Sequence, residues 1–272
     1  MDNLKAKKRH PEEIAVYSAI YVCAAFSVLL LLGIIVYVFA KGARRVNWAF
    51  LTGVTSILHG TVGIAGNILN TLIIILLTMI ITTPIGVGAA IYLNEYAKPG
   101  KLVTVIIFAT ETLAGIPSII FGLFGMLFFG QLCHMGYSLL TGSLTLTLMV
   151  LPLVTRNTQE ALKTVPDSFR TGAVGLGAGK WYTIRTILLP SAMPGIVTGV
   201  ILAIGRIVGE TAALIYTAGT VAEVSKGLLS SGRTLAIHMY VLSSEGLYTN
   251  QAYATAVVLL IFVLIINFMS SL

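Results

Sequence analysis

The segment TGAVGLGAGKWYTIRTILLP, residues 171–190, combines four glycines with a Gly-Lys pair and leads into a long apolar run. A phosphate-binding Walker A loop requires Gly, four residues, and then Gly-Lys-Ser/Thr. Val174 stands where the first glycine should be, and Trp181 stands where the Ser/Thr should be. The dinucleotide fingerprint is also absent, because the glycines of 175–179 are spaced G-x-G-x-G and no strand is expected before them. The segment therefore predicts no nucleotide binding, and we do not expect this chain to be an enzyme.

The rest of the chain is strongly apolar. Hydrophobic residues make up 57% of the 272 residues and charged residues only 10%, whereas about 25% of a soluble domain is charged. One soluble core of this size cannot hide so many apolar side chains, so the composition predicts an integral membrane protein in contact with lipid. The four histidines show no metal-ligand spacing, and we expect no metal or cofactor.

Six apolar runs approach the roughly 20 residues that cross a bilayer as a helix, which predicts an all-α protein with six transmembrane helices. Strands of an outer-membrane barrel would alternate over about 10 residues, whereas these runs are continuously apolar. Pro84 and Pro117 should kink their helices, and G-x-x-x-G pairs at 195–199 and 205–209 favour close helix packing. The expected spans are 14–40, 67–93, 102–130, a fourth span of which 144–158 is a part, 195–218 and 251–271.

The basic residues predict the orientation in the membrane. We expect a short N-terminal segment, 1–13, and one transmembrane domain, 14–272, whose longest loop is 159–194. Lys and Arg are concentrated in 1–13, 98–101 and 156–185, and cytoplasmic loops carry the excess of these residues. This pattern places both termini and the 159–194 loop in the cytoplasm. The net charge of +7 is therefore a topology signal, and no nucleic-acid partner is expected.

Three charged residues, Glu111, Arg206 and Glu210, fall inside the expected spans. A charge at the centre of a membrane helix costs at least about 2.5–3.5 kcal/mol on insertion scales, so such residues usually face a transport path or a partner. Glu111 and Arg206 are both expected near the midplane, where they could pair. Arg206 and Glu210 are also four residues apart, on one face of a helix. An arginine suits an oxyanion, while a structural ion pair that fixes helix packing is the alternative.

The segment 171–190 also resembles a known signature. The EAA signature of ABC-importer permeases reads Glu-Ala-Ala, three residues, Gly, nine residues, and Ile-x-Leu-Pro. The matching positions in this sequence are Thr171, Gly172, Ala173, Gly177, Ile187, Leu189 and Pro190. Of the opening triplet only the last alanine is kept, as Ala173, and Thr171 stands in place of the glutamate. The resemblance implies a coupling helix in the 159–194 loop that docks on an ATP-binding cassette subunit.

Three further stretches closely resemble the permeases of phosphate-specific ABC importers, and the PstA type more than the PstC type. They are ITTPIGVGAAIYLNEYA (81–97), TETLAGIPSIIFGLFG (110–125) and AIGRIVGETAALIYTAG (203–219). The resemblance implies a type I importer fold, shared with the maltose and methionine permeases, in the bacterial cytoplasmic membrane. It implies a PstC-like second permease as heterodimer partner, a homodimer of ATPase subunits and an external phosphate-binding protein. Arg206, together with Glu210 and Glu111, is expected to line the substrate path.

Other functions remain open from the sequence. A permease for sulfate or molybdate would have the same architecture. A secondary carrier driven by an ion gradient would show inverted repeats, which are not obvious here, and would leave the coupling segment unexplained. A membrane scaffold without transport would leave the three intramembrane charges unexplained.

Overall fold

A computed structural model describes residues 11–56, 61–246 and 248–270. Most of the expected 1–13 segment lies outside the described residues. Within them, five helices are long and apolar enough to cross a membrane, and a sharply bent helix pair would make a sixth. The expected all-α class is confirmed, with one small antiparallel hairpin of β1 (Val54–Ser56) and β2 (Thr61–Ile64) added at one end.

The long helices are continuous stretches of apolar residues. They are α1 (Pro11–Gly42), α3 (Ala65–Ile91), α6 (Leu139–Lys163), α9 (Leu189–Val208) and α12 (Thr249–Ser270). Helix α3 continues into the π-helical segment η2 (Tyr92–Tyr96), and α9 is preceded by α8 (Lys180–Thr183) and the π-helical segment η4 (Ile184–Leu188). The shorter elements are η1 (Ala43–Arg45), α2 (Trp48–Thr52), α4 (Lys101–Gly115), α5 (Ser118–Gly125), η3 (Met126–Leu132), α7 (Asp167–Gly175), α10 (Ala212–Ile215) and α11 (Leu235–Glu245).

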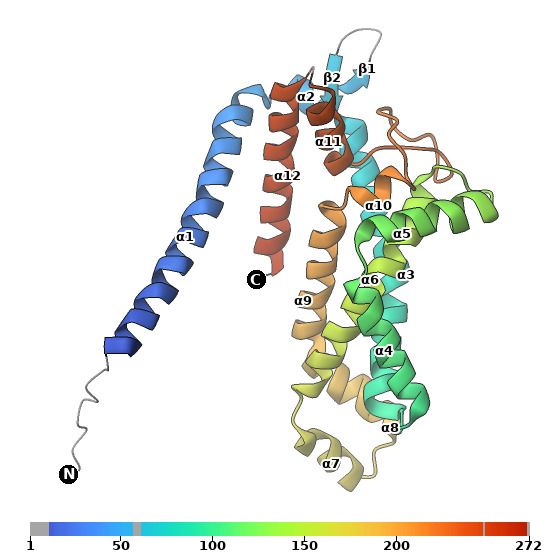
Figure 1. Cartoon of the computed structure of the whole chain (residues 1–272). Helices are drawn as coiled ribbons and strands as arrows, with labels where there is room; N and C mark the ends of the chain where they lie inside the picture. Colours follow the sequence, from blue (N-terminus) through green and yellow to red (C-terminus); the bar gives the residue numbers. More distant parts are fainter. Residues whose placement is uncertain (1–10, 57–60, 247, 271–272) are drawn as a thin grey trace.

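Helix α6 forms the centre of the bundle, with α3 and α9 packed along it (Figure 1). Its Leu146 and Val150 are fully buried in the main core. Glycine permits the close approach of α9, because a Cβ atom at Gly199 would lie 2.6 Å from the Cβ atom of Asn157. The 195–199 pair therefore mediates helix packing as expected, whereas a Cβ at Gly205 would meet nothing within 4 Å.

Helix α1 stands apart from the main bundle and packs beside α12 (Figure 1). The rings of Tyr37 and Tyr253 meet edge to face with centroids 5.9 Å apart. Most of the other large apolar side chains of α1, such as Phe26 and Leu29, are exposed in the single chain. The length and hydropathy of α1 suit a helix surrounded by lipid or by another subunit.

The third expected span, 102–130, is not one helix. Helices α4 and α5 meet at an angle of 102° across residues 116 and 117. Proline lacks a backbone N–H and forces the residue before it out of the helical region, and Ile116 is indeed extended, with φ −75° and ψ 132°. Pro84, by contrast, lies inside α3 without ending it, so the kink expected at Pro117 is a full break.

The expected fourth span, of which 144–158 is a part, is confirmed. It extends through Leu139–Lys163, and Ser138 caps it by accepting a hydrogen bond from the Thr141 N–H at 3.1 Å. The fifth, expected at 195–218, ends at Val208. The long loop expected at 159–194 is mostly helical, and the segment that links α6 to α8 is 164–179.

Candidate functional site

A cavity of about 180 Å³ lies between α4, α6 and α9. Its charged lining residues are Glu111 of α4, Arg156 of α6 and Arg206 of α9. The rest of the lining consists of Thr110, Ala114, Met149, Pro152 and Leu153. The structure therefore brings Glu111 and Arg206 to one site, as the sequence suggested, although no ion pair within 4 Å joins them among the described residues.

The cavity lies about halfway along the central helix. Residues 149–153 are at the middle of α6, which runs from Leu139 to Lys163. Helix α9 is held in register with α6 through the close contact of Gly199 with Asn157, and this register brings Arg206 to the level of the cavity. The mid-bundle position expected for Arg206 follows from this register.

Sequence reasoning missed Arg156, because the fourth span was expected to end near it. Met149, Leu153 and Arg156 recur at helical spacing and all line the cavity. The exposed Arg156 also pairs with Glu160 one turn later, with Nε and Oε1 3.4 Å apart. The lining therefore holds two guanidinium groups and one carboxylate, and because Glu160 balances Arg156, Arg206 is the lining cation without an ion pair among the described residues.

Glu210 is not where the sequence placed it. Because α9 ends at Val208, Glu210 is not on a helix face with Arg206, and it does not line the cavity. Its Oε1 instead accepts a hydrogen bond from the Ala213 N–H at 3.0 Å, at the start of α10. The carboxylate thereby satisfies a free N–H at a helix start, and its expected place in the substrate path stays a prediction.

The EAA-like positions begin on α7, which lies at the far end of the bundle from α2 and α11 (Figure 1). Thr171 and Gly172 are exposed, while Ala173 is the one buried residue of this helix. Gly177 ends the helix with a left-handed φ of +78°. The Ala178 N–H donates to the Ala173 carbonyl and the Gly177 N–H to the Val174 carbonyl, both at 2.9 Å, which is the hydrogen-bond pattern of a Schellman motif.

The surface around this turn is apolar and open. A Cβ atom added at Gly172, Gly175, Gly177 or Gly179 would meet nothing within 4 Å, so no described part of this chain requires these glycines to be small. The side chain of Leu176 is 91% exposed. We call the exposed apolar residues Phe169, Val174, Leu176, Trp181 and Tyr182 the α7 surface. Several exposed apolar side chains on one short segment are typical of an interaction site.

The second half of the signature is structural. Ile187 lies in η4, and Leu189 and Pro190 form the start of α9. Because α8, η4 and α9 form one helical run, Lys180–Val208, Pro190 lies inside that run, where proline lacks the N–H of a regular helical hydrogen bond. Leu189 packs against a buried cluster of Leu162, Val165, Ile184, Leu188, Ala192 and Ile196 beneath α7.

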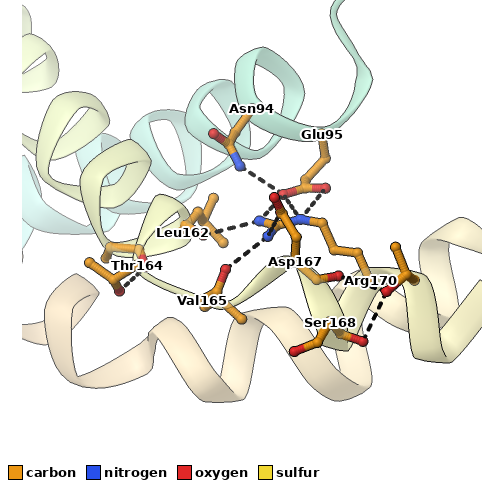
Figure 2. Close-up of polar contacts among 10 residues, drawn as sticks. Asn94, Glu95, Leu162, Thr164, Val165, Asp167, Ser168 and Arg170 are labelled. Atoms are coloured by element: carbon orange, nitrogen blue, oxygen red, sulfur yellow. Dashed lines mark hydrogen bonds and ion pairs between the residues drawn. The ribbon is translucent and has the colours of Figure 1, made fainter.

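A charged contact that the sequence did not reveal fastens α7 to the end of α3 (Figure 2). Arg170 Nη2 lies 2.8 Å from Glu95 Oε1, and the Glu95 side chain is only 8% exposed. The same guanidinium donates to the carbonyls of Leu162 and Val165, both at 3.0 Å, and to Asp167 Oδ1 at 3.1 Å. The hydrogen bond with Glu95 raises the pKa of Arg170 above its usual value, so this arginine stays cationic.

Comparisons with known proteins identify the family of the chain. Residues 82–272 match the family described as binding-protein-dependent transport system inner membrane component. The chain is 35% identical over 261 residues to the probable ABC transporter permease protein YqgI of Bacillus subtilis, covering 90% of this chain and 89% of that protein. It is 34% identical over 232 residues to the phosphate transport system permease protein PstA of Xylella fastidiosa, covering 84% of this chain and 80% of that protein.

Solved structures share the fold. A chain of a bacterial alginate ABC transporter superposes with a TM-score of 0.69 at 16% identity, covering 95% of this chain and 94% of that one. A chain of the MetNI methionine ABC transporter in an inward-facing conformation gives 0.60 at 22% identity, covering 77% and 91%. The expected MetI-like permease fold is confirmed. The chain belongs to the family of binding-protein-dependent transport system inner membrane components, the permease subunits of ABC transporters.

Proposed function

We propose that this chain is the PstA-type permease subunit of an ATP-driven importer of inorganic phosphate and forms one half of the translocation path. The observation that carries the proposal is the cavity at the middle of the bundle, with Arg156, Arg206 and Glu111 in its lining. Support comes also from relatives named as phosphate permeases, including PstA of Xylella fastidiosa. A PstC-like permease would supply the other half of the path, and an external phosphate-binding protein would deliver the substrate.

In this proposal the energy comes from partner subunits. Two ATP-binding cassette subunits would dock on the α7 surface and on its counterpart in the second permease. An apolar helix surface seated in a groove is a common mode of recognition. The open glycines of α7 and its following turn would let a partner backbone approach closely. The α7 end would face the cytoplasm, in agreement with the concentration of basic residues at 156–185.

The charge pattern of the cavity suits phosphate. A guanidinium donates paired hydrogen bonds to oxyanions, and such charge-assisted bonds are roughly twice as strong as bonds between neutral groups. Glu111 would offset one positive charge of the lining and accept a hydrogen bond from a protonated phosphate oxygen. It also keeps binding weak enough for release. Arg206 would therefore be the main anion contact and Arg156 the second.

The test is phosphate uptake by the complete complex, reconstituted in vesicles with its ATPase and binding protein. Arg206→Gln should lower ATP-driven uptake at least about tenfold, because a hydrogen bond to a charged group contributes roughly 1.5–3 kcal/mol. Arg206→Lys should retain part of the uptake, since it keeps the charge but loses the planar fork. Arg44→Gln removes an exposed guanidinium of η1 and serves as the control, with uptake expected to be unchanged.

A double variant separates transport from structure. If Arg206 and Glu111 only balance each other, Arg206→Gln with Glu111→Gln should restore uptake at equal membrane abundance, and this result would refute the proposed role. Inhibition of phosphate uptake by excess sulfate or molybdate would instead assign the chain to another oxyanion. Uptake that follows an ion gradient without ATP would identify a secondary carrier.

A further inference from the structure

Helix α7 is attached to the body of the protein mainly by polar contacts. Of its nine residues only Ala173 is buried, so apolar packing holds it weakly. The guanidinium of Arg170 is 23% exposed and reaches three elements at once. It binds the Glu95 carboxylate of η2, the Leu162 carbonyl in the last turn of α6, and the Asp167 carboxylate of α7 itself (Figure 2).

A second contact joins the same short segment of α3 to the far side of the α7 turn. The Lys180 ammonium at the start of α8 lies 4.8 Å from the ring centroid of Tyr96 in η2, within the range of a cation–π interaction. The Asn94 side chain donates to Glu95 Oε1 at 2.7 Å and orients that carboxylate. Both ends of the segment that carries the α7 surface are therefore bound to the π-helical end of α3.

The covalent connection between α7 and α8 is less stiff. It runs through 176–179, where Gly177 and Gly179 have no neighbour within 4 Å of a Cβ position. Glycine is the residue with the greatest backbone freedom. We therefore expect the path through 176–179 to carry a displacement of α7 to α9 less directly than the contact with η2 carries it to α3. The charged contact with η2, in contrast, is short, nearly buried on the carboxylate side and made by a rigid planar group.

We propose that the Glu95–Arg170 contact is the rigid link through which movement of α7 reaches the transmembrane helices, with α7 and the end of α3 moving as one body. Glu95 and Arg170 are positioning residues in this scheme. Helix α3 packs tightly along α6, where a Cβ at Gly86 would lie 2.9 Å from Val154 Cγ1. Displacement of η2 would thus be transmitted to the helix that carries Arg156. The inference rests on the coupling role proposed above for the α7 surface.

Substitution of the link should separate ATP hydrolysis from transport. Removing Arg170 alone would leave the nearly buried Glu95 carboxylate without its partner and could prevent folding. The informative variant is therefore the neutral pair Glu95→Gln with Arg170→Gln, which leaves no unpaired buried charge, since Asp167 is 92% exposed. In the reconstituted complex we expect ATP hydrolysis to continue while phosphate transported per ATP falls about tenfold, within the usual range of coupling between sites.

Two further variants define the chemistry. Arg170→Lys keeps the positive charge, but an ammonium cannot reach Glu95 and the two carbonyls together, so uptake per ATP should fall as in the neutral pair. Asp167→Asn is the matched control. It removes a 92% exposed partner of the same guanidinium and leaves the contact with Glu95 intact, so coupling should equal that of the wild type.

The outcomes distinguish this inference from the proposed function. If the wild-type complex performs no ATP-driven phosphate uptake, the proposed function fails. If the wild type transports phosphate and the neutral pair couples normally, only the link is refuted. A parallel loss of hydrolysis, uptake and thermal stability in the neutral pair would show a merely structural contact and would also refute the link.

A distance measurement tests the one-body movement directly. Spin labels at Tyr92→Cys in η2 and Ser168→Cys in α7, in a chain whose Cys23 and Cys133 are replaced by serine, report the separation of the two elements. In the assembled complex the distance should be narrow and equal with and without ATP, and the neutral pair should broaden it. A wild-type distance that changes with nucleotide would overturn the proposal.

Discussion

Gly177 has a structural task that is independent of any partner. Its φ of +78° ends α7, and this left-handed conformation is costly for residues with a side chain. Gly172 differs, because it lies inside α7 and is as open as Gly177. Gly177 is therefore required by the backbone conformation. Gly172 is not, and its small size would matter only for the close approach of a partner.

We expect opposite intrinsic effects of alanine at these two positions. Gly177→Ala should lower the free energy of unfolding by about 1–2 kcal/mol locally, while Gly172→Ala should stabilise α7 by roughly 0.5–1 kcal/mol. If an ATPase backbone packs on this face, Gly172→Ala should nevertheless weaken its binding. Hydrogen exchange of α7 and binding of the ATPase to the purified permease measure the two effects. Unchanged ATPase binding in Gly172→Ala would contradict a close contact at this glycine.

Close contacts between helices explain how the broken third span is held. Helix α5 turns away from α4 at Pro117 and lies against α10. A Cβ atom at Gly122 would lie 2.8 Å from the Cα atom of Ala213 and 3.0 Å from its carbonyl oxygen. These are backbone atoms, which cannot move aside as a flexible side chain can. Gly122 therefore sets how closely α5 approaches the segment that follows α9.

Gly122→Ala should accordingly destabilise the protein by about 1–3 kcal/mol, the usual cost of overpacking. Gly33→Ala on α1 is the matched control, because nothing lies within 4 Å of its Cβ position, and it should be neutral or slightly stabilising. Thermal unfolding of the two purified variants in the same detergent makes the comparison. Equal stability of both variants would show that the α5–α10 contact can relax.

The whole molecule has two distinct ends. One carries α2, the β1–β2 hairpin and α11, and the other carries α7 (Figure 1). Helix α1 begins toward the α7 end and finishes beside α2. The basic residues of 98–101 and 156–185 favour the α7 end as cytoplasmic.

Cysteine labelling tests this orientation. In a chain without Cys23 and Cys133, Trp48→Cys in α2 should react in whole cells with a membrane-impermeant reagent, whereas Ser168→Cys in α7 should react only after permeabilisation. Both positions are exposed in the structure, so access across the membrane decides the result. Labelling of Ser168→Cys from outside, with no reaction at Trp48→Cys, would reverse the topology.

The sequence alone determined the class of protein, the approximate places of the membrane helices and the coupling signature. Hydropathy is a local, additive property, so a long apolar run identifies a membrane helix wherever it packs. The EAA-like spacing indicated α7 and its turn for the same local reason. The start of α9 was missed, because the fifth span was expected to begin at 195 and α9 begins at Leu189.

Tertiary structure alone decided which charges meet. Glu111, Arg156 and Arg206 belong to three helices, and only the packing register of α6 with α4 and α9 brings them to one cavity. Glu95 and Arg170 are 75 positions apart, and nothing in either local sequence indicates the other. The end of α9 before Glu210 was missed as well, although Gly209 at its C-cap is a local stop signal. The hydrophobic effect removes an apolar segment from water, but it does not determine which other segment it contacts. Close packing and hydrogen bonds select those neighbours.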